Sequence, residues 1–226
     1  MKLFAAILFT MLNILPSSAE EIPLIHSSQQ LLLAVKSGED FSEPQAAIAT
    51  ASETDIASQL SNDMLKKTFW INIYNAYVQI LLHKDSTAYN SRNSFFGNPV
   101  IEVAGKIISL DFIEHGILRR SKIKISMGYL NKPFPSSLEK KWRVQTLDNR
   151  IHFALNCGAK SCPPIAFYSP SRIDEQLDIA RAGYLSAECD YDSIAGAIAV
   201  PKILDWFRGD FGGKKGIVAL LQQQNI

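Results

Sequence analysis

The sequence predicts an α+β fold, in the form of a helix-rich single domain with a small antiparallel or mixed sheet. Stretches with helical periodicity outnumber stretches that alternate like strands. Few of them follow one another in the strand–helix–strand order of a parallel sheet. After removal of the N-terminal leader described next, about 205 residues remain, a length that suits one domain with a complete hydrophobic core.

The N-terminus has the pattern of a cleaved secretory signal. Lys2 gives a positive start, residues 3–15 are apolar, and residues 17–19 are small, as a signal peptidase requires. The apolar run is too short for a stable membrane span. We therefore expect cleavage after Ala19, which leaves residues 20–226 as a bacterial periplasmic or secreted domain without a membrane span.

The balance of charges argues against nucleic acid as a partner. The chain has 23 lysine and arginine residues and 22 acidic residues, and the leader takes away one lysine and no acid. The remaining chain is close to neutral, so no basic field exists to hold a phosphate backbone. A small molecule or a peptide is the expected kind of ligand.

The first helices are predicted from caps and periodicity. Ser27 or Ser28 can cap a first helix, which Gly38 ends. Residues 43–60 are rich in alanine and serine, and their weak periodicity is compatible with further helix.

The most apolar helix of the chain is expected over residues 63–84, starting at Asn62 or Asp63. An element that is apolar nearly all round belongs in the centre of the core. Three amide side chains nevertheless share one stripe of it, namely Asn72, Asn75 and Gln79. A buried amide without partners costs about 1–3 kcal/mol, so these amides either hold a neighbouring loop or line a site.

A β-hairpin and another helix come next. Residues 99–109 contain two β-branched runs around a short Ala-Gly-Lys turn, and Ser109 can cap a helix over residues 110–120. Helical spacing puts Glu114 with Leu118 on one face, and His115 with Arg119 on another.

The second half of the chain alternates irregular and regular segments. Residues 121–147 have no clear pattern, which is often the mark of a functional loop or lid. Residues 150–156 alternate like a strand, with Arg150, His152 and Asn156 on the polar face. Next we expect a loop at 157–170, a helix at 171–189, a strand at 193–200 and helices at 202–211 and 215–224.

Four stretches in this order, FWINIYNA, SLDFIEHGILR, DNRIHFALNCGAKSCPPIAFYSPSRIDEQLDIARAGYL and ILDWFRGDF, resemble the bacterial exported members of the domain-of-unknown-function 547 family. The resemblance covers about residues 60–212. It implies a shared fold without naming a reaction. The positions that match the family pattern are Asn72, Asn75, Glu114, His115, Arg119, Arg150, His152, Cys157 and Ser161, and the position that matches Cys162 varies more in the family.

One hypothesis for these residues is a cysteine-dependent hydrolase or acyltransferase, for which a papain- or transglutaminase-like form of the α+β class would be suitable. Cys157 would be the nucleophile, and His152 or His115 the base. Glu114 or one of the core asparagines would orient the imidazole. The spacing of five between histidine and cysteine matches no known local motif of that class, so a structural thiol and a core histidine remain the alternative.

Two further hypotheses concern the cysteines. A zinc site is conceivable from His115, His152, Cys157 and Cys162, but the CGAKSC spacing is at the edge of what zinc ligands show. We therefore expect no metal and no other cofactor. In an oxidising compartment Cys157 and Cys162 are also close enough to form a disulfide, which would leave Cys189 alone.

The preferred hypothesis is a binding module for a small anionic or peptide-like ligand. Its polar site would combine Asn72, Asn75, Glu114, His115, Arg119, Arg150, His152 and Cys157, with Ser161 nearby. The arginines would supply forked donors to an anion. The alternative for both arginines is a half-buried ion pair, with Glu114 and Asp148 as the obvious partners. The hypothesis requires the core asparagines, His152 and Glu114 to enclose one polar hollow.

Overall fold

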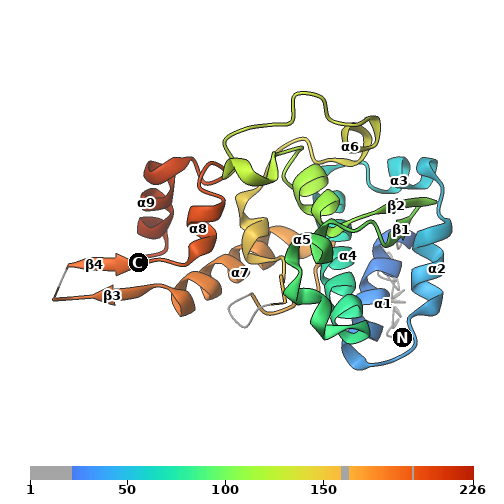
Figure 1. Cartoon of the computed structure of the whole chain (residues 1–226), viewed down its shortest axis with the longest axis horizontal. Coiled ribbons are helices and arrows are strands. Elements are labelled where there is room, and N and C mark those ends of the chain that lie inside the picture. Colours follow the sequence, from blue (N-terminus) through green and yellow to red (C-terminus); the bar gives the residue numbers. More distant parts are fainter. Residues whose placement is uncertain (1–21, 159–162, 195) are drawn as a thin grey trace, which may run out of the picture.

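The computed structural model describes residues 22–158, 163–194 and 196–226 (Figure 1). The α-helices in the described part are α1 (Pro23–Ser37), α2 (Ser42–Thr50), α3 (Glu53–Gln59), α4 (Asp63–Lys84), α5 (Arg92–Gly97), α6 (Ser137–Trp142), α7 (Ile173–Glu188), α8 (Lys202–Trp206) and α9 (Gly213–Gln223). Other helical turns are η1 (Ser86–Asn90), η2 (Phe112–Leu118), η3 (Lys124–Ser126), η4 (Asn149–Phe153) and η5 (Pro170–Arg172). The strands form two antiparallel pairs, β1 (Ile101–Val103) with β2 (Lys106–Ile108), and β3 (Asp190–Asp192) with β4 (Ala197–Ala199). The predicted α+β class is confirmed.

Helix α4 is the centre of the main hydrophobic core, as its composition predicted. The Asn62 side chain accepts a hydrogen bond from the Leu65 backbone N–H at 3.0 Å and so caps the helix. Trp70 is fully buried and packs against Phe69 and Trp142, with ring centroids 4.8 and 5.4 Å apart. Because the helix is enclosed on nearly all sides, any polar side chain in its middle must find its partners inside the protein.

The N-terminal helices cover one side of α4. Helix α1 packs along α4, and α2 packs against α1 and β1. Helix α1 begins at Pro23, earlier than the cap predicted at Ser27 or Ser28, because the proline fits the first helical turn, where its missing N–H costs nothing. It ends where predicted, at Gly38, whose φ of 72° favours glycine.

The predicted hairpin is present, and its turn also caps the C-terminal end of α2. Ile101 is opposite Ile108 in the β1–β2 pair. The turn donates the backbone N–H groups of Ala104 and Gly105 to the carbonyls of Ile48 and Ala49, at 3.0 and 2.8 Å. These carbonyls belong to the last turn of α2 and would otherwise lack partners.

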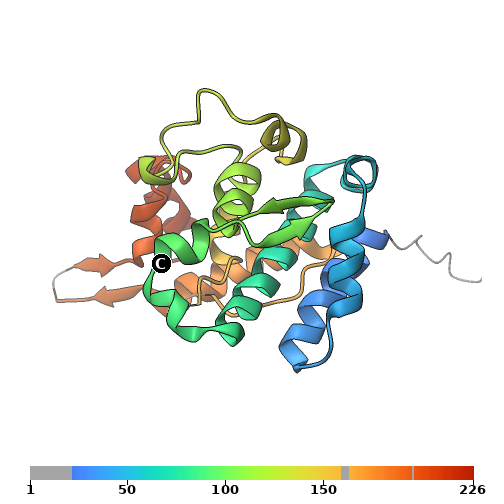
Figure 2. The ribbon, with the colours of Figure 1, turned by 45° about the vertical axis from the view of Figure 1, so that its right-hand side comes forward.

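The C-terminal part has its own smaller apolar cluster. Phe153 and Leu185 pack there with Leu204 and Phe211 and with the buried end of α9. Helices α8 and α9 lie together at one end of the molecule, and the β3–β4 hairpin projects away from it (Figures 1 and 2). The molecule therefore has a main body around α4 and a C-terminal end around α8 and α9, joined through α7 and η4.

The strand predicted over residues 150–156 is wrong. The segment is the 3-10 helix η4, in which the Asp148 side chain accepts a hydrogen bond from the Arg150 backbone N–H at 3.1 Å. Ile151, His152 and Phe153 are all buried. The alternation of apolar and polar residues therefore does not separate a core face from a solvent face, and no neighbouring strand pairs with the segment in the described part of the chain.

Three other segments differ in detail from the prediction. The irregular region 121–147 contains η3 and α6, and the weakly periodic region 43–60 is two helices, α2 and α3. The strand predicted at 193–200 is shorter, and it pairs with β3, which the sequence did not indicate. The predicted signal segment, residues 1–19, lies outside the described residues. No helix within the described ranges combines the length and the hydropathy of a membrane span.

Candidate functional site

A cavity of about 940 Å³ opens between the main body and the C-terminal end. Four of the residues predicted for the site line it: Glu114, His115, His152 and Cys157. They come from η2, from η4 and from the loop after η4. Other parts of its wall come from α4, α5, the end of α7 and α8. Segments that are distant in sequence therefore converge on one hollow, whose volume is typical of small-ligand sites.

His152 is held at the back of this cavity by a buried carboxylate. Its Nε2 lies 2.9 Å from Oδ2 of Asp210, and both side chains are almost completely buried. The ring stacks on Phe207 at 3.9 Å. Burial lowers the pKa of His152 below its ordinary value, and the opposing effect of Asp210 is smaller. The ring is therefore neutral at pH 7, donates its Nε2 proton to Asp210, and keeps Nδ1 as its basic nitrogen.

The same carboxylate holds Arg119. The Nε of Arg119 lies 2.6 Å from Asp210 Oδ2, and its guanidinium lies over the Phe207 ring at 4.6 Å. Burial would raise the pKa of Asp210, but the hydrogen bonds from His152 and Arg119 outweigh burial and lower it. Arg119 is fully buried and does not line the cavity. Its partner is Asp210 rather than the predicted Glu114.

His115 is the second imidazole in the cavity wall. Its Nδ1 lies 2.8 Å from Nη1 of Arg119, and its Nε2 lies 3.5 Å from Oδ1 of Asp111. The predicted shared face of His115 and Arg119 is thus present. Arg119 connects the two histidines, because it contacts His115 directly and His152 through Asp210.

Glu114 lies in a helical turn of uncommon geometry. Helix η2 has π-helical geometry, with Arg119 N–H donating to the Glu114 carbonyl at 2.8 Å. It is followed by Arg120 and Ser121, which both have positive φ, at 55° and 62°. π-Turns and left-handed non-glycine residues are uncommon and are found more often at functional sites. This geometry favours a functional role for the Glu114–His115 pair.

The two core asparagines hold loops and do not line the cavity. Asn72 donates to the Tyr168 carbonyl at 3.0 Å and accepts from the Tyr168 N–H at 3.1 Å. Asn75 donates to the Ala154 carbonyl at 3.0 Å and accepts from the Asn156 N–H at 2.9 Å. Each amide thus satisfies two backbone groups of a loop. Asn75 in this way fixes the chain between His152 and Cys157.

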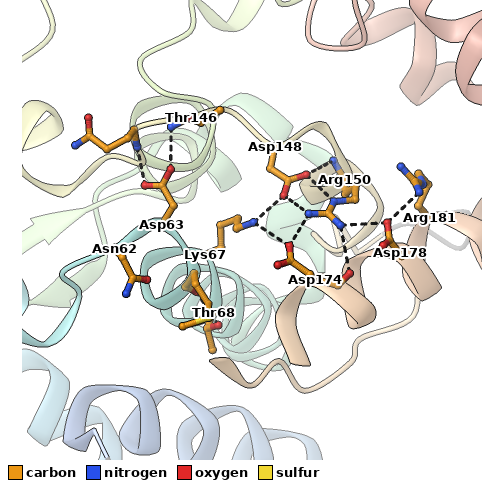
Figure 3. Close-up of polar contacts among 12 residues, drawn as sticks. Asn62, Asp63, Lys67, Thr68, Thr146, Asp148, Arg150, Asp174, Asp178 and Arg181 are labelled. Atoms are coloured by element: carbon orange, nitrogen blue, oxygen red, sulfur yellow. Dashed lines mark hydrogen bonds and ion pairs between the residues drawn. The ribbon is translucent and has the colours of Figure 1, made fainter. Parts of the chain in front are cut away.

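Arg150 belongs to a separate ion network, shown in Figure 3. Its guanidinium reaches Asp148 at 2.7 and 2.9 Å and also bonds to Asp174 and Asp178 on α7. Lys67 of α4 adds a 2.7 Å contact to Asp148. Burial would raise the pKa of Asp148, but Arg150 and Lys67 outweigh it and lower that pKa well below its usual range. The network joins α4, η4 and α7 and leaves no forked donor of Arg150 for a cavity ligand.

Some predicted residues lie outside the described part of the chain. These are Ser161 and Cys162, so the Cys157–Cys162 disulfide and the four-ligand zinc set stay predictions. No group of three or more potential metal ligands is found among the residues the structure does describe. Cys189 is half-buried at the end of α7, and burial raises the pKa of its thiol.

Sequence reasoning missed two residues that contact the predicted site residues, namely Asp210 behind the cavity and Tyr74 in its wall. Asp210 lies in the ILDWFRGDF stretch, between Gly209 and Phe211, and a carboxylate among aromatic residues was the signal for it. Tyr74 lies between the two asparagines, and its hydroxyl donates to Glu114 Oε2 at 3.3 Å. Burial, followed by the charge of Glu114, raises the pKa of Tyr74 well above its usual value.

Comparison with known families gives one match. Residues 57–185 match the family described as "Protein of unknown function, DUF547". The match is shorter than the resemblance noted above and ends before the stretch that carries Asp210. Comparisons with curated proteins and with solved structures give no match. Because the matched segment covers more than half of the sequence, the chain belongs to the DUF547 family.

Proposed function

We propose that this domain binds a peptide-like ligand in the cavity between its main body and its C-terminal end. The single observation that carries the proposal is the convergence of Glu114, His115, His152 and Cys157 on one hollow of about 940 Å³. Aromatic side chains such as Tyr184 complete its wall. A mostly apolar hollow with a few placed polar groups is the usual form of a ligand site.

The two arginines predicted to hold an anion are not available in the cavity. Arg119 is fully buried against Asp210 and His115, Arg150 is used by three aspartates, and neither lines the hollow. A peptide instead offers N–H groups to Glu114 and carbonyl groups to donors, and its side chains fill apolar space. An exported location, which the N-terminal pattern favours, is also part of this proposal.

The test is ligand-dependent thermal stabilisation with a panel of short peptides. Val200 lines the cavity and is 39% exposed, so a Val200→Trp variant should fold and obstruct the cavity. Val218, which is 53% exposed on α9 and does not line the cavity, gives the matched control Val218→Trp. We expect stabilisation of the wild type and the control and its loss in Val200→Trp. Equal stabilisation of all three would refute the assignment to this cavity.

The second candidate is a cysteine-dependent hydrolase or acyltransferase, now with a specific arrangement. His152 has a buried carboxylate partner on Nε2 and shares the cavity with Cys157. A base that a third group orients is what such catalysis requires. Asp210 would fill the orienting role, in place of the predicted Glu114, Asn72 or Asn75.

This candidate concerns the reduced protein and has its own test. Alkylation by iodoacetamide, read by mass spectrometry across pH, compares Cys157 with Cys189, whose pKa is raised. A catalytic Cys157 should react well below pH ~8.5, the usual thiol value, and should slow in His152→Gln. If Cys157 reacts no faster than Cys189 at neutral pH after reduction, the hydrolase candidate is rejected.

A further inference from the structure

The contact between Arg119 and His115 fixes the proton of the His115 ring. A guanidinium has donors and no acceptor. Its Nη1 lies 2.8 Å from His115 Nδ1, so Nδ1 must accept and cannot carry a proton. The other ring nitrogen, Nε2, is then the one that can donate, and it faces Asp111 at 3.5 Å.

Among the residues that the structure describes, this assignment leaves the Glu114 carboxylate without a cation in direct contact. Its Oε1 lies 3.7 Å from His115 Nδ1, but that nitrogen has no proton to share. Among the described residues the donor that reaches its carboxylate is the Tyr74 hydroxyl, at 3.3 Å. Asp111 differs, because Lys124 contacts both of its oxygens at 2.7 and 3.0 Å.

Glu114 faces the cavity in this uncompensated state. Its side chain is 14% exposed, and it lines the hollow. A carboxylate that is mostly removed from water and lacks a positive partner is costly. A ligand that brings a positive charge to this point would remove the cost on binding.

The walls around Glu114 suit an ammonium group on an apolar stem. Trp206, Tyr184 and Phe96 line the same hollow, and aromatic faces attract ammonium groups while they pack against methylenes. Two other rings are already occupied by cations of the protein, since Arg119 lies over Phe207 and Arg92 lies over Tyr89 at 5.0 Å.

We propose that the ligand presents a primary ammonium group to Glu114. This inference rests on the proposed peptide-binding function and narrows it. A peptide can supply this group from its N-terminus or from a lysine side chain. Both sources give the same chemistry at Glu114, and the experiment below separates them.

The experiment uses four tetrapeptide amides with the same apolar residues. The peptide N-terminus is either free or acetylated, and one position is either lysine or norleucine. The four peptides therefore carry both ammonium groups, only the N-terminal one, only the lysine one, or neither. Titration calorimetry on the full chain measures each affinity. We expect at least one charged peptide to bind about tenfold or more tightly than the doubly uncharged peptide, and the better single-charge peptide identifies the source.

Two variants test whether the preference for charged peptides depends on Glu114. Glu114→Gln keeps the size of the side chain and removes its charge, so it should abolish the preference. It should also be at least as stable as the wild type, since a costly buried charge is lost. Glu102→Gln, on an exposed position of β1 away from the cavity, should keep the preference.

The possible failures have different meanings. If none of the four peptides binds, the proposed function fails together with this inference. If all four bind equally well to the wild type, peptide binding stands and the ammonium contact is overturned. A preference that persists in a folded Glu114→Gln also overturns it. Should that variant not fold, the wild-type preference and its decrease at high salt decide the question.

Discussion

The substitution Asn72→Asp tests whether the core asparagines act as loop clamps. Asn72 is fully buried and makes a pair of hydrogen bonds with the Tyr168 backbone, one as donor at 3.0 Å and one as acceptor at 3.1 Å. An aspartate has the same size and keeps the accepting oxygen. It replaces the donating NH₂ group with an oxygen that faces the Tyr168 carbonyl.

The expected loss of stability is large and depends on pH. An unsatisfied buried carbonyl costs about 1–3 kcal/mol, and a buried charge without a partner brings the total to about 3–5 kcal/mol at pH 7. Burial raises the pKa of such a carboxyl in the folded state. The folded variant then binds more protons than the unfolded chain, so the loss shrinks as the pH falls, because a protonated carboxyl can donate to Tyr168 again.

Urea unfolding followed by circular dichroism at pH 7 and pH 5 measures both effects. Asn62→Asp is the matched control, because it makes the same change at the exposed N-cap of the same helix, where aspartate caps as well as asparagine. A loss below about 1 kcal/mol for Asn72→Asp, or a loss equal to that of the control, would refute the clamp role.

Three further predictions concern other parts of the polar framework. Arg150→Lys should lower the free energy of unfolding by about 1.5–3 kcal/mol, because one ammonium group cannot replace the forked hydrogen bonds of the guanidinium to three aspartates. Urea unfolding measures this loss, and no change would contradict a stabilising role for the Arg150 ion network. The free energy of unfolding of the wild type should decrease as the pH falls below 6.5, because the unfolded chain protonates His152 before the folded one does. His152→Gln should reduce this dependence of stability on pH between pH 7 and 5. An unchanged pH dependence would exclude His152 as its source. Gly128→Ala should lower the melting temperature, because Gly128 has a φ of 86° and an added Cβ would overlap Asp210. Gly183→Ala should raise the melting temperature, because Gly183 lies in α7 with open space around it. Equal effects of the two substitutions would contradict the close contact between Gly128 and Asp210.

Local patterns predicted the elements that depend on their own residues. Asn62 caps α4, Gly38 ends α1, and the β1–β2 hairpin turns at Ala104 and Gly105, as expected. The apolar character of α4 also predicted its central position. In each case neighbouring residues decide the outcome, through a cap or a turn that the short stretch itself supplies.

The remaining features depend on contacts between distant segments. Periodicity placed His152 on a strand, but the Asp148 cap and burial on all sides produce a 3-10 turn. The partner of His152 and Arg119 is Asp210, 58 residues after His152, and no local pattern links those positions. Of the residues that the sequence suggested for one site, Glu114, His115, His152 and Cys157 line the same cavity, whereas Asn72, Asn75, Arg119 and Arg150 do not.

The position of Asp210 has a practical consequence for anyone who shortens this protein. A chain trimmed at residue 185, where the family match ends, would lose the counter-charge of Arg119, which is fully buried. The guanidinium would then have to reach water or disrupt its surroundings, and the His152 ring would lose its orientation. Domain borders drawn from family membership alone would thus remove a segment on which the geometry of the cavity depends.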